Sequence, residues 1–214
     1  MKAALLLVIA LLASADAPLP AGQKVIDRMV ARVDDDVILM SDIRQLGKYQ
    51  QLVNGKSESD AQLLDRLIDQ WIVRTEAETA RFPPPSSADV ERSLQKLQGS
   101  FANLQEYEQH REQAGLSKDE VRLLVDSQLY LSSYLESRFR PLVHVEQKAI
   151  KDFYNENVVP MAKARGQAPP TLEASTDAIQ EALTQKGIDE QADRWLKESR
   201  ARIQVQKFLD ESPQ

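Results

Sequence analysis

Apolar and polar residues alternate with a period of two within the segment KVIDRMVARVDDDVILMSDI, residues 24–43. Arg28 and Arg32 separate the apolar positions, a pattern typical of a half-buried β-strand. The apolar positions are Met29, Ala31 and Val33. Three aspartates then favour a turn, and a second β-branched run follows them. The pattern predicts a β-hairpin that leads directly into a helix capped by Ser41 or Asp42.

Most of the remaining chain has apolar residues at three- and four-residue intervals, which is typical of amphipathic helices. The expected helices span about residues 41–53, 61–82, 86–98, 103–114, 117–140 and 145–157. Asn103 and Ser117 are the expected N-caps of the two helices that begin with them, and Ser117 opens a capping box with Glu120. Trp71 lies in the clearest apolar stripe and is therefore expected in the core.

The C-terminal quarter has two different patterns. Residues 158–175 are rich in proline and polar residues and predict a loop, after which helical spacing resumes from 176 with an interruption near Gly187. Ile203 and Val205 then alternate with glutamines, which predicts a short strand that pairs with the opening hairpin. The expected fold is mainly α, a helical bundle with a small N-terminal β-hairpin joined by a C-terminal strand.

The first residues, MKAALLLVIALLASADA, have the features of a cleaved signal peptide: Lys2, an apolar run and an Ala-Ser-Ala cleavage signal. The apolar run is short for a membrane span, although a retained anchor is the alternative. We expect residues 1–15 to be removed and residues 16–23 to form a flexible mature N-terminus. Losing Lys2 changes the formal charge from −6 to −7. An acidic chain without a basic stripe gives no support for nucleic-acid binding.

Residues that could carry catalysis are few. The chain has no cysteine, which removes thiolate nucleophiles and cysteine-based metal sites. His110 and His144 are the two histidines, and neither belongs to a metal-binding motif. The aspartates at 34–36 lack the spacing of a calcium loop, and no Walker A or G-x-S-x-G sequence occurs. The sequence therefore predicts no catalytic residue, metal site or cofactor.

Five motifs in order resemble one known family: VARVDDDVILMSDI, LLDRLIDQWIVRTEAE, YLESRFRPLV, VEQKAIKDFYNEN and DRWLKESRARIQVQKFL. They resemble the N-terminal chaperone module of the periplasmic SurA-type proteins, over residues 24–158 and 176–209. In that family, parvulin prolyl-isomerase domains follow an FY-containing helix, and the chain returns through a W-L-x-x-x-R helix. Phe153 and Tyr154 match the exit point, and Trp195, Leu196 and Arg200 match the return.

The resemblance implies one chaperone domain over residues 24–209, built from an N-terminal part, 24–157, and a returning helix and strand, 176–209. The segment 158–175 stands where a parvulin domain would be inserted. It has 18 residues, fewer than the roughly 50 that an autonomous domain needs. The isomerase activity of the family is therefore not expected here, and the protein is expected not to be an enzyme.

The function that the resemblance implies is ATP-independent holding of unfolded exported proteins in the periplasm, outer-membrane precursors above all. Aromatic residues beside the main apolar stripes are the candidate client-binding residues, with packing between helices as the alternative: Tyr49, Tyr130, Tyr134 and Phe139. Two other hypotheses stay open. One is a dedicated interaction or assembly module with a single partner, and the other is a prolyl isomerase with an unrecognised site. Neither the clients nor the oligomeric state follow from the sequence.

Overall fold

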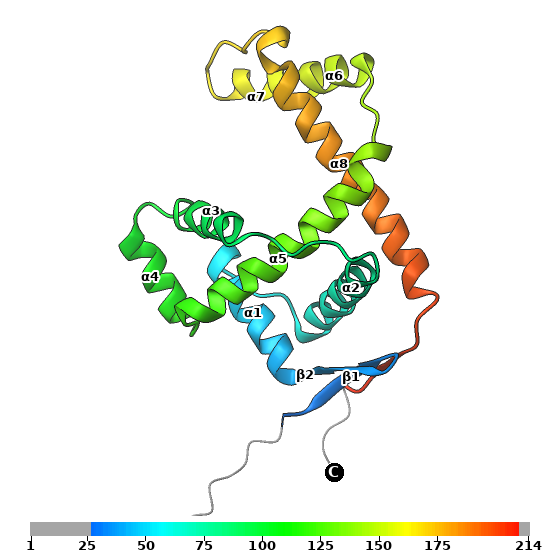
Figure 1. Cartoon of the computed structure of the whole chain (residues 1–214). Helices are drawn as coiled ribbons and strands as arrows, with labels where there is room; N and C mark the ends of the chain where they lie inside the picture. Colours follow the sequence, from blue (N-terminus) through cyan, green and yellow to red (C-terminus); the bar gives the residue numbers. More distant parts are fainter. Residues whose placement is uncertain (1–26, 210–214) are drawn as a thin grey trace, which may run out of the picture.

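A small antiparallel sheet lies at one end of a mainly α-helical structure, which confirms the predicted fold class (Figure 1). The computed structural model describes residues 27–209, so the predicted signal peptide (1–15) and mature N-terminus (16–23) lie outside the described residues. The strands are β1 (Met29–Val33), β2 (Asp36–Leu39) and β3 (Val205–Lys207). The helices are α1 (Met40–Asn54), α2 (Asp60–Thr79), α3 (Ser87–Gln98), α4 (Leu104–Gln113), α5 (Lys118–Phe139), α6 (Gln147–Phe153), α7 (Val159–Ala164) and α8 (Leu172–Arg200).

The predicted hairpin is present, and the predicted C-terminal strand pairs with it. The strand order is β2-β1-β3, and β1 is antiparallel to both neighbours. Asp34 occupies the hairpin turn with φ 49°, a left-handed conformation that aspartate tolerates. Its N–H donates to the Gln204 carbonyl (2.9 Å), and its Oδ1 accepts from the Gln204 N–H (2.8 Å). The turn therefore holds the returning end of the chain in the sheet.

Short polar side chains set the starts of five helices, and the sequence predicts two of these caps, Asn103 and Ser117. The predicted N-cap of α1 at Ser41 or Asp42 is wrong. The N-cap is Leu39, and its N–H donates to Asp42 in the first turn (2.8 Å). The N-cap side chain accepts a backbone N–H of the first turn at Ser59, Ser86, Asn103, Ser117 and Thr171. In α2, α3 and α5 a Gln, Asp or Glu three residues later returns a bond to the N-cap backbone, which completes a capping box. These bonds satisfy backbone donors that have no partner within the helix.

Two apolar clusters form the interior, and α5 belongs to both. The main core joins the sheet, α1, α2, the second half of α5 and α8, around buried residues such as Ile43, Ile68 and Ile188. The second core joins the end of α1 to α3, α4 and the first half of α5, around Val90 and Val121. Because α5 crosses from one cluster to the other, it fixes how the two halves of the body lie against each other (Figure 1).

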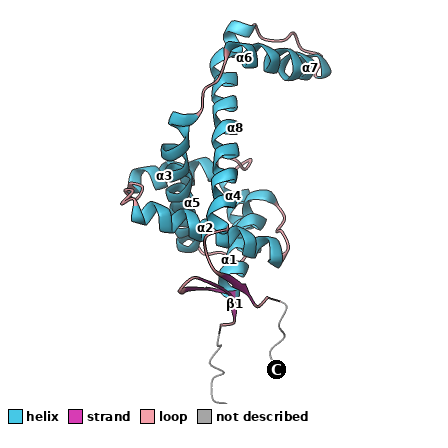
Figure 2. Ribbon diagram, turned by 90° about the vertical axis from the view of Figure 1, so that its right-hand side faces the viewer, coloured by secondary structure: helices cyan, strands magenta, loops and turns pink. Residues whose placement is uncertain are grey.

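Helix α8 extends beyond the body and carries α6 and α7 at its far end, where they form a projecting arm (Figures 1 and 2). Ile150 and Ile179 pack in this arm and are almost fully buried. A π-helical turn, Tyr154–Val158, connects α6 to α7. The Tyr154 hydroxyl donates to the Pro170 carbonyl (2.7 Å) and so ties the following loop to the arm.

The loop predicted over residues 158–175 is mostly wrong. Residues Val159–Ala164 are helical, and α8 begins at Leu172 rather than at 176. Pro160 does not prevent α7 because it follows the π-helical turn Tyr154–Val158. There the Val159 N–H bonds to the Tyr154 carbonyl, and the regular α-helical bonding pattern is already interrupted. Thr171 supplies the N-cap of α8, upstream of the predicted start at residue 176.

The predicted interruption of α8 near Gly187 is also wrong, because the helix is continuous from Leu172 to Arg200. Gly187 instead allows a close approach of the segment that enters the arm. A Cβ atom at this position would lie 2.6 Å from Val143 Cγ1, well inside van der Waals contact. The glycine is therefore explained by packing rather than by a break in the helix.

We expect Gly187→Ala to destabilise the protein by about 1 kcal/mol, because overpacking against Val143 exceeds the gain in helix propensity. Urea unfolding followed by circular dichroism measures the difference. Combining Gly187→Ala with Val143→Ala removes the clash, so the double variant is expected to recover most of the loss. A more stable single variant would contradict the packing explanation.

Candidate binding groove

A groove with a volume of about 380 Å³ opens where α1, α2 and α5 meet beside β2. Its walls come from one residue of β2 and from one face of each helix: Ile38, Asp42, Gln45, Leu46, Leu67, Gln70, Trp71, Arg74, Leu123, Leu124, Ser127 and Gln128. The groove runs along the first half of α5, the half that packs into the second core while α2 belongs to the main core. It therefore lies at the junction of the two apolar clusters.

The apolar part of the groove remains accessible to solvent. Leu67, Trp71 and Leu124 are half-buried, so each presents part of its side chain to the groove. Leu123 is 65% exposed, the largest value among the exposed large apolar residues of the described chain. It lies on α5 outside the stripe that packs into the second core. Leu123 and Trp71 line the same groove, and apolar side chains that are exposed together are more typical of a binding surface than of a solvated helix face.

The polar part of the groove is rich in amides. Gln45, Gln70 and Gln128 come from three different helices and are half-buried. An amide side chain both donates and accepts hydrogen bonds, so it can pair with a peptide backbone of any sequence. Together with the apolar wall, these amides suit an extended polypeptide, whose side chains vary while its backbone groups do not.

Two hydrogen bonds between side chains hold the walls of the groove. The Trp71 indole N–H donates to Asp36 Oδ2 (2.8 Å), which joins α2 to β2. The Arg74 guanidinium donates to the Ser127 hydroxyl (2.5 Å), which joins α2 to α5. Trp71 was predicted to lie in the core. It packs against the main core but is only half-buried, because its indole N–H faces the exposed Asp36 carboxylate.

The predicted client-binding residues lie outside the α1–α2–α5 groove. Tyr49 is half-buried and lines a neighbouring hollow that shares Gln128 with the groove. Burial, with a smaller contribution from Tyr107, raises the pKa of the Tyr49 hydroxyl. Tyr130 is half-buried in the main core region, where its hydroxyl donates to the Phe82 carbonyl (3.3 Å).

Tyr134 and Phe139 are buried, with exposed fractions of 4% and 5%. The Tyr134 ring contacts Phe82 edge-on, with centroids 5.5 Å apart, and Phe139 packs against Trp195 at 5.8 Å. These two residues therefore offer no accessible surface to a client, and packing between helices, the alternative given by the sequence, describes them. The reason is that α8 returns across α5 and covers the face that carries Phe139.

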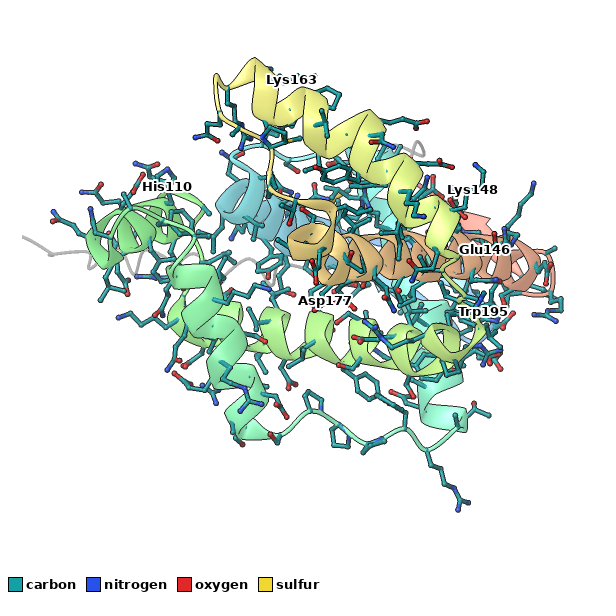
Figure 3. The ribbon with its side chains drawn as sticks, turned by 90° about the horizontal axis from the view of Figure 1, so that it is seen from above. His110, Glu146, Lys148, Lys163, Asp177 and Trp195 are labelled. Carbon is teal, nitrogen blue, oxygen red and sulfur yellow. The ribbon has the colours of Figure 1, made fainter. Side chains whose placement is uncertain are left out.

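The structure gives the two histidines ordinary surroundings. His110 Nδ1 lies 2.9 Å from the Glu106 carbonyl within α4, and its ring lies beside Phe101. His144 is exposed in the segment before α6. Figure 3 places His110 on the far side of the molecule from Trp195 and separates Glu146 and Lys148, at one end of the α6–α7 arm, from Lys163 at the other. Among residues 27–209, no three His, Cys, Asp or Glu side chains come together as a metal site would require.

The chain matches no protein-family model, and no curated protein matches it in sequence. Within residues 27–209, none of the helices has both the length and the apolar character that a membrane crossing requires.

Proposed function

We propose that this protein is an ATP-independent chaperone that holds unfolded exported proteins in the α1–α2–α5 groove. The observation that carries the proposal is the accessible apolar wall formed by Leu67, Trp71 and Leu123, next to amides from three helices. Such a wall can shield apolar client segments that would otherwise associate with each other as exposed strands. The amides can pair with the client backbone without selecting its sequence.

The order of motifs in the sequence supports the same proposal, since they resemble the chaperone module of the SurA-type proteins. The proposed location is the periplasm, after removal of residues 1–15, and the proposed clients are outer-membrane precursors. We propose that the protein binds its clients and catalyses no reaction on them. Modest affinity is expected, because a disordered client loses conformational entropy when it is held.

The test is light scattering of an outer-membrane porin diluted from urea, with and without the purified protein and without ATP. The protein is expected to suppress aggregation when it is present in amounts comparable to the porin. Absence of suppression by the folded protein would overturn the proposal. Specific capture of one folded partner, with no effect on unfolded clients, would instead favour a dedicated interaction module.

Leu123→Ser is expected to weaken client binding about five- to tenfold, because it removes the most exposed apolar side chain of the groove. The stability of the protein should change little, since Leu123 is 65% exposed. Titration of the porin against each variant in the scattering assay gives the comparison.

Leu104→Ser is the matched control for Leu123→Ser. Leu104 is 59% exposed, lies on α4 and does not line the α1–α2–α5 groove. The control variant should retain wild-type activity. Equal losses in the two variants would show that general surface hydrophobicity, and not the groove, holds the client.

A further inference from the structure

The outer edge of the sheet lies directly beside the groove. Met40 N–H donates to the Arg28 carbonyl (2.8 Å), toward β1, whereas Leu39 N–H donates to Asp42 Oδ2 (2.8 Å) on the opposite side. Because Asp42 also lines the groove, the groove adjoins the edge of β2 that faces away from β1.

Val37 presents the open backbone groups of this edge. Successive residues of an antiparallel strand direct their N–H and C=O groups to alternate sides. Val37 lies two residues before Leu39 on β2, so its N–H and C=O point to the same side as those of Leu39, which is away from β1. The sheet order is β2-β1-β3, so none of the described strands lies beyond β2 on that side. Val37 therefore offers one donor and one acceptor to an incoming strand.

The two edges of the sheet differ in how far they are protected against pairing with a further strand. On the edge formed by β3, Lys207 is a charged residue, and its ammonium reaches Asp65 on α2 (2.7 Å). Lysine at an edge strand is a common means of preventing strand pairing. On the edge formed by β2, Val37 has outward-facing backbone groups, as Lys207 has on β3, but it is apolar and 52% exposed. The β2 edge thus lacks the protection that β3 has.

The charges around the β2 edge indicate what kind of segment would fit. Asp34, Asp35 and Asp36 lie at the hairpin, and Asp42 lies at the other end of the edge. Two nearby guanidinium groups offset part of this charge: Arg32 lies 3.9 Å from Asp35, and Arg74 stays charged beside the groove because its partner, the Ser127 hydroxyl, is neutral. The excess negative charge favours a segment that carries lysine or arginine.

We propose that the β2 edge and the α1–α2–α5 groove form one site, in which an extended apolar and basic client segment binds as a fourth strand. The inference rests on the proposed function and adds the conformation and charge of the bound segment. The client backbone pairs with Val37, and alternate side chains enter the groove between Ile38 and Trp71. Because the edge offers a single pair of backbone groups, the strand pairing is short and does not select the sequence of the client.

The main test uses the wild-type protein and a fluorescein-labelled synthetic peptide in which one short stretch alternates valine with lysine. Glycine and serine flank this stretch, so that a slip in register would take apolar side chains out of the groove. A series of these peptides, each N-methylated at one amide, is titrated by fluorescence anisotropy. Strand pairing predicts a loss of about tenfold at the amide that faces the Val37 carbonyl and little effect at its two neighbours. Replacing lysine by glutamate in the peptide should weaken binding and reverse its salt dependence.

The outcomes separate this inference from the proposed function. If the parent peptide binds, and Leu123→Ser weakens it, but methylation has no positional pattern, strand pairing is overturned and groove binding stands. If porin aggregation is suppressed but the parent peptide does not bind, the proposal that an apolar and basic segment binds as a fourth strand is overturned. If neither porin nor peptide is bound, the proposed function fails together with this inference.

A pair of proline variants tests the same edge from the side of the protein. Val37→Pro removes the outward N–H of β2 without removing a bond to β1, and a proline at an edge is compatible with a folded sheet. Val205→Pro does the same on the β3 edge, since the neighbouring Gln204 faces β1. Peptide affinity should fall about tenfold in Val37→Pro only. Equal affinities in two folded variants would overturn the pairing.

Discussion

Trp195→Ala is expected to lower the free energy of unfolding by about 3–5 kcal/mol, the typical cost of truncating a buried large aromatic residue. Trp195 is 8% exposed, belongs to the main core and connects α8 to the second half of α5. Its ring lies against Phe139, with centroids 5.8 Å apart, and the Arg138 guanidinium lies 5.0 Å from its centroid. A loss of this size is a large fraction of the 5–15 kcal/mol that a typical domain has.

The chain contains two tryptophans, so Trp71→Ala serves as the comparison. Trp71 is half-buried at the groove, and its removal should cost less stability while weakening client binding more. Urea unfolding followed by far-ultraviolet circular dichroism avoids dependence on tryptophan fluorescence. Similar losses of stability in the two variants would contradict the assignment of Trp195 to the core and Trp71 to the groove.

Local signals in the sequence indicate where some of the helices start, but not how far they extend. Ser117 and Asn103 cap their helices as predicted, because the capping bonds lie within one turn of the residue. Gly187 was interpreted as a break, since glycine weakens a helix. Its actual neighbour, Val143, is distant in the sequence, and only the folded chain shows that a side chain would not fit.

The groove was missed because helical periodicity shows which residues face other helices, not where two helices diverge. Trp71 lies in the same apolar stripe of α2 as several core residues. Next to Trp71, however, α5 passes from the second core to the main core, and the two helices leave the groove between them. Leu123 was the available signal, as an apolar residue off the packed stripe of α5. The aromatic residues were a weaker signal, since Tyr134 and Phe139 also lie near a stripe and are buried when α8 returns.

Arg200 ties the end of α8 to α2 and to the C-terminal strand. Its Nε donates to Asp69 (2.6 Å), and its Nη1 and Nη2 donate to the Asp65 carboxylate (3.1 Å) and carbonyl (2.5 Å). Lys207 of β3 donates to the same Asp65 carboxylate (2.7 Å). Burial raises the pKa of Asp65, but the hydrogen bonds from Lys207 and Arg200 outweigh it and hold the pKa below its usual value.

We therefore expect Arg200→Ala to lower the free energy of unfolding at neutral pH by about 1–2 kcal/mol, a modest value because the side chain is 33% exposed and screened by solvent. A carboxyl with a lowered pKa stabilises the folded state above its unfolded pKa of about 4, and this contribution disappears as the pH falls through the folded value. The difference between wild type and Arg200→Ala should accordingly shrink below about pH 4.

Urea unfolding of both proteins at pH values on either side of that range measures the effect. Arg194→Ala is the matched control, since Arg194 is exposed on the same helix and forms none of the salt bridges found in the described part of the chain. It should resemble wild type at every pH. A loss in Arg200→Ala that does not depend on pH would mean that the arginine stabilises the return of the chain by packing, and that the ion pairs with Asp65 and Asp69 contribute little.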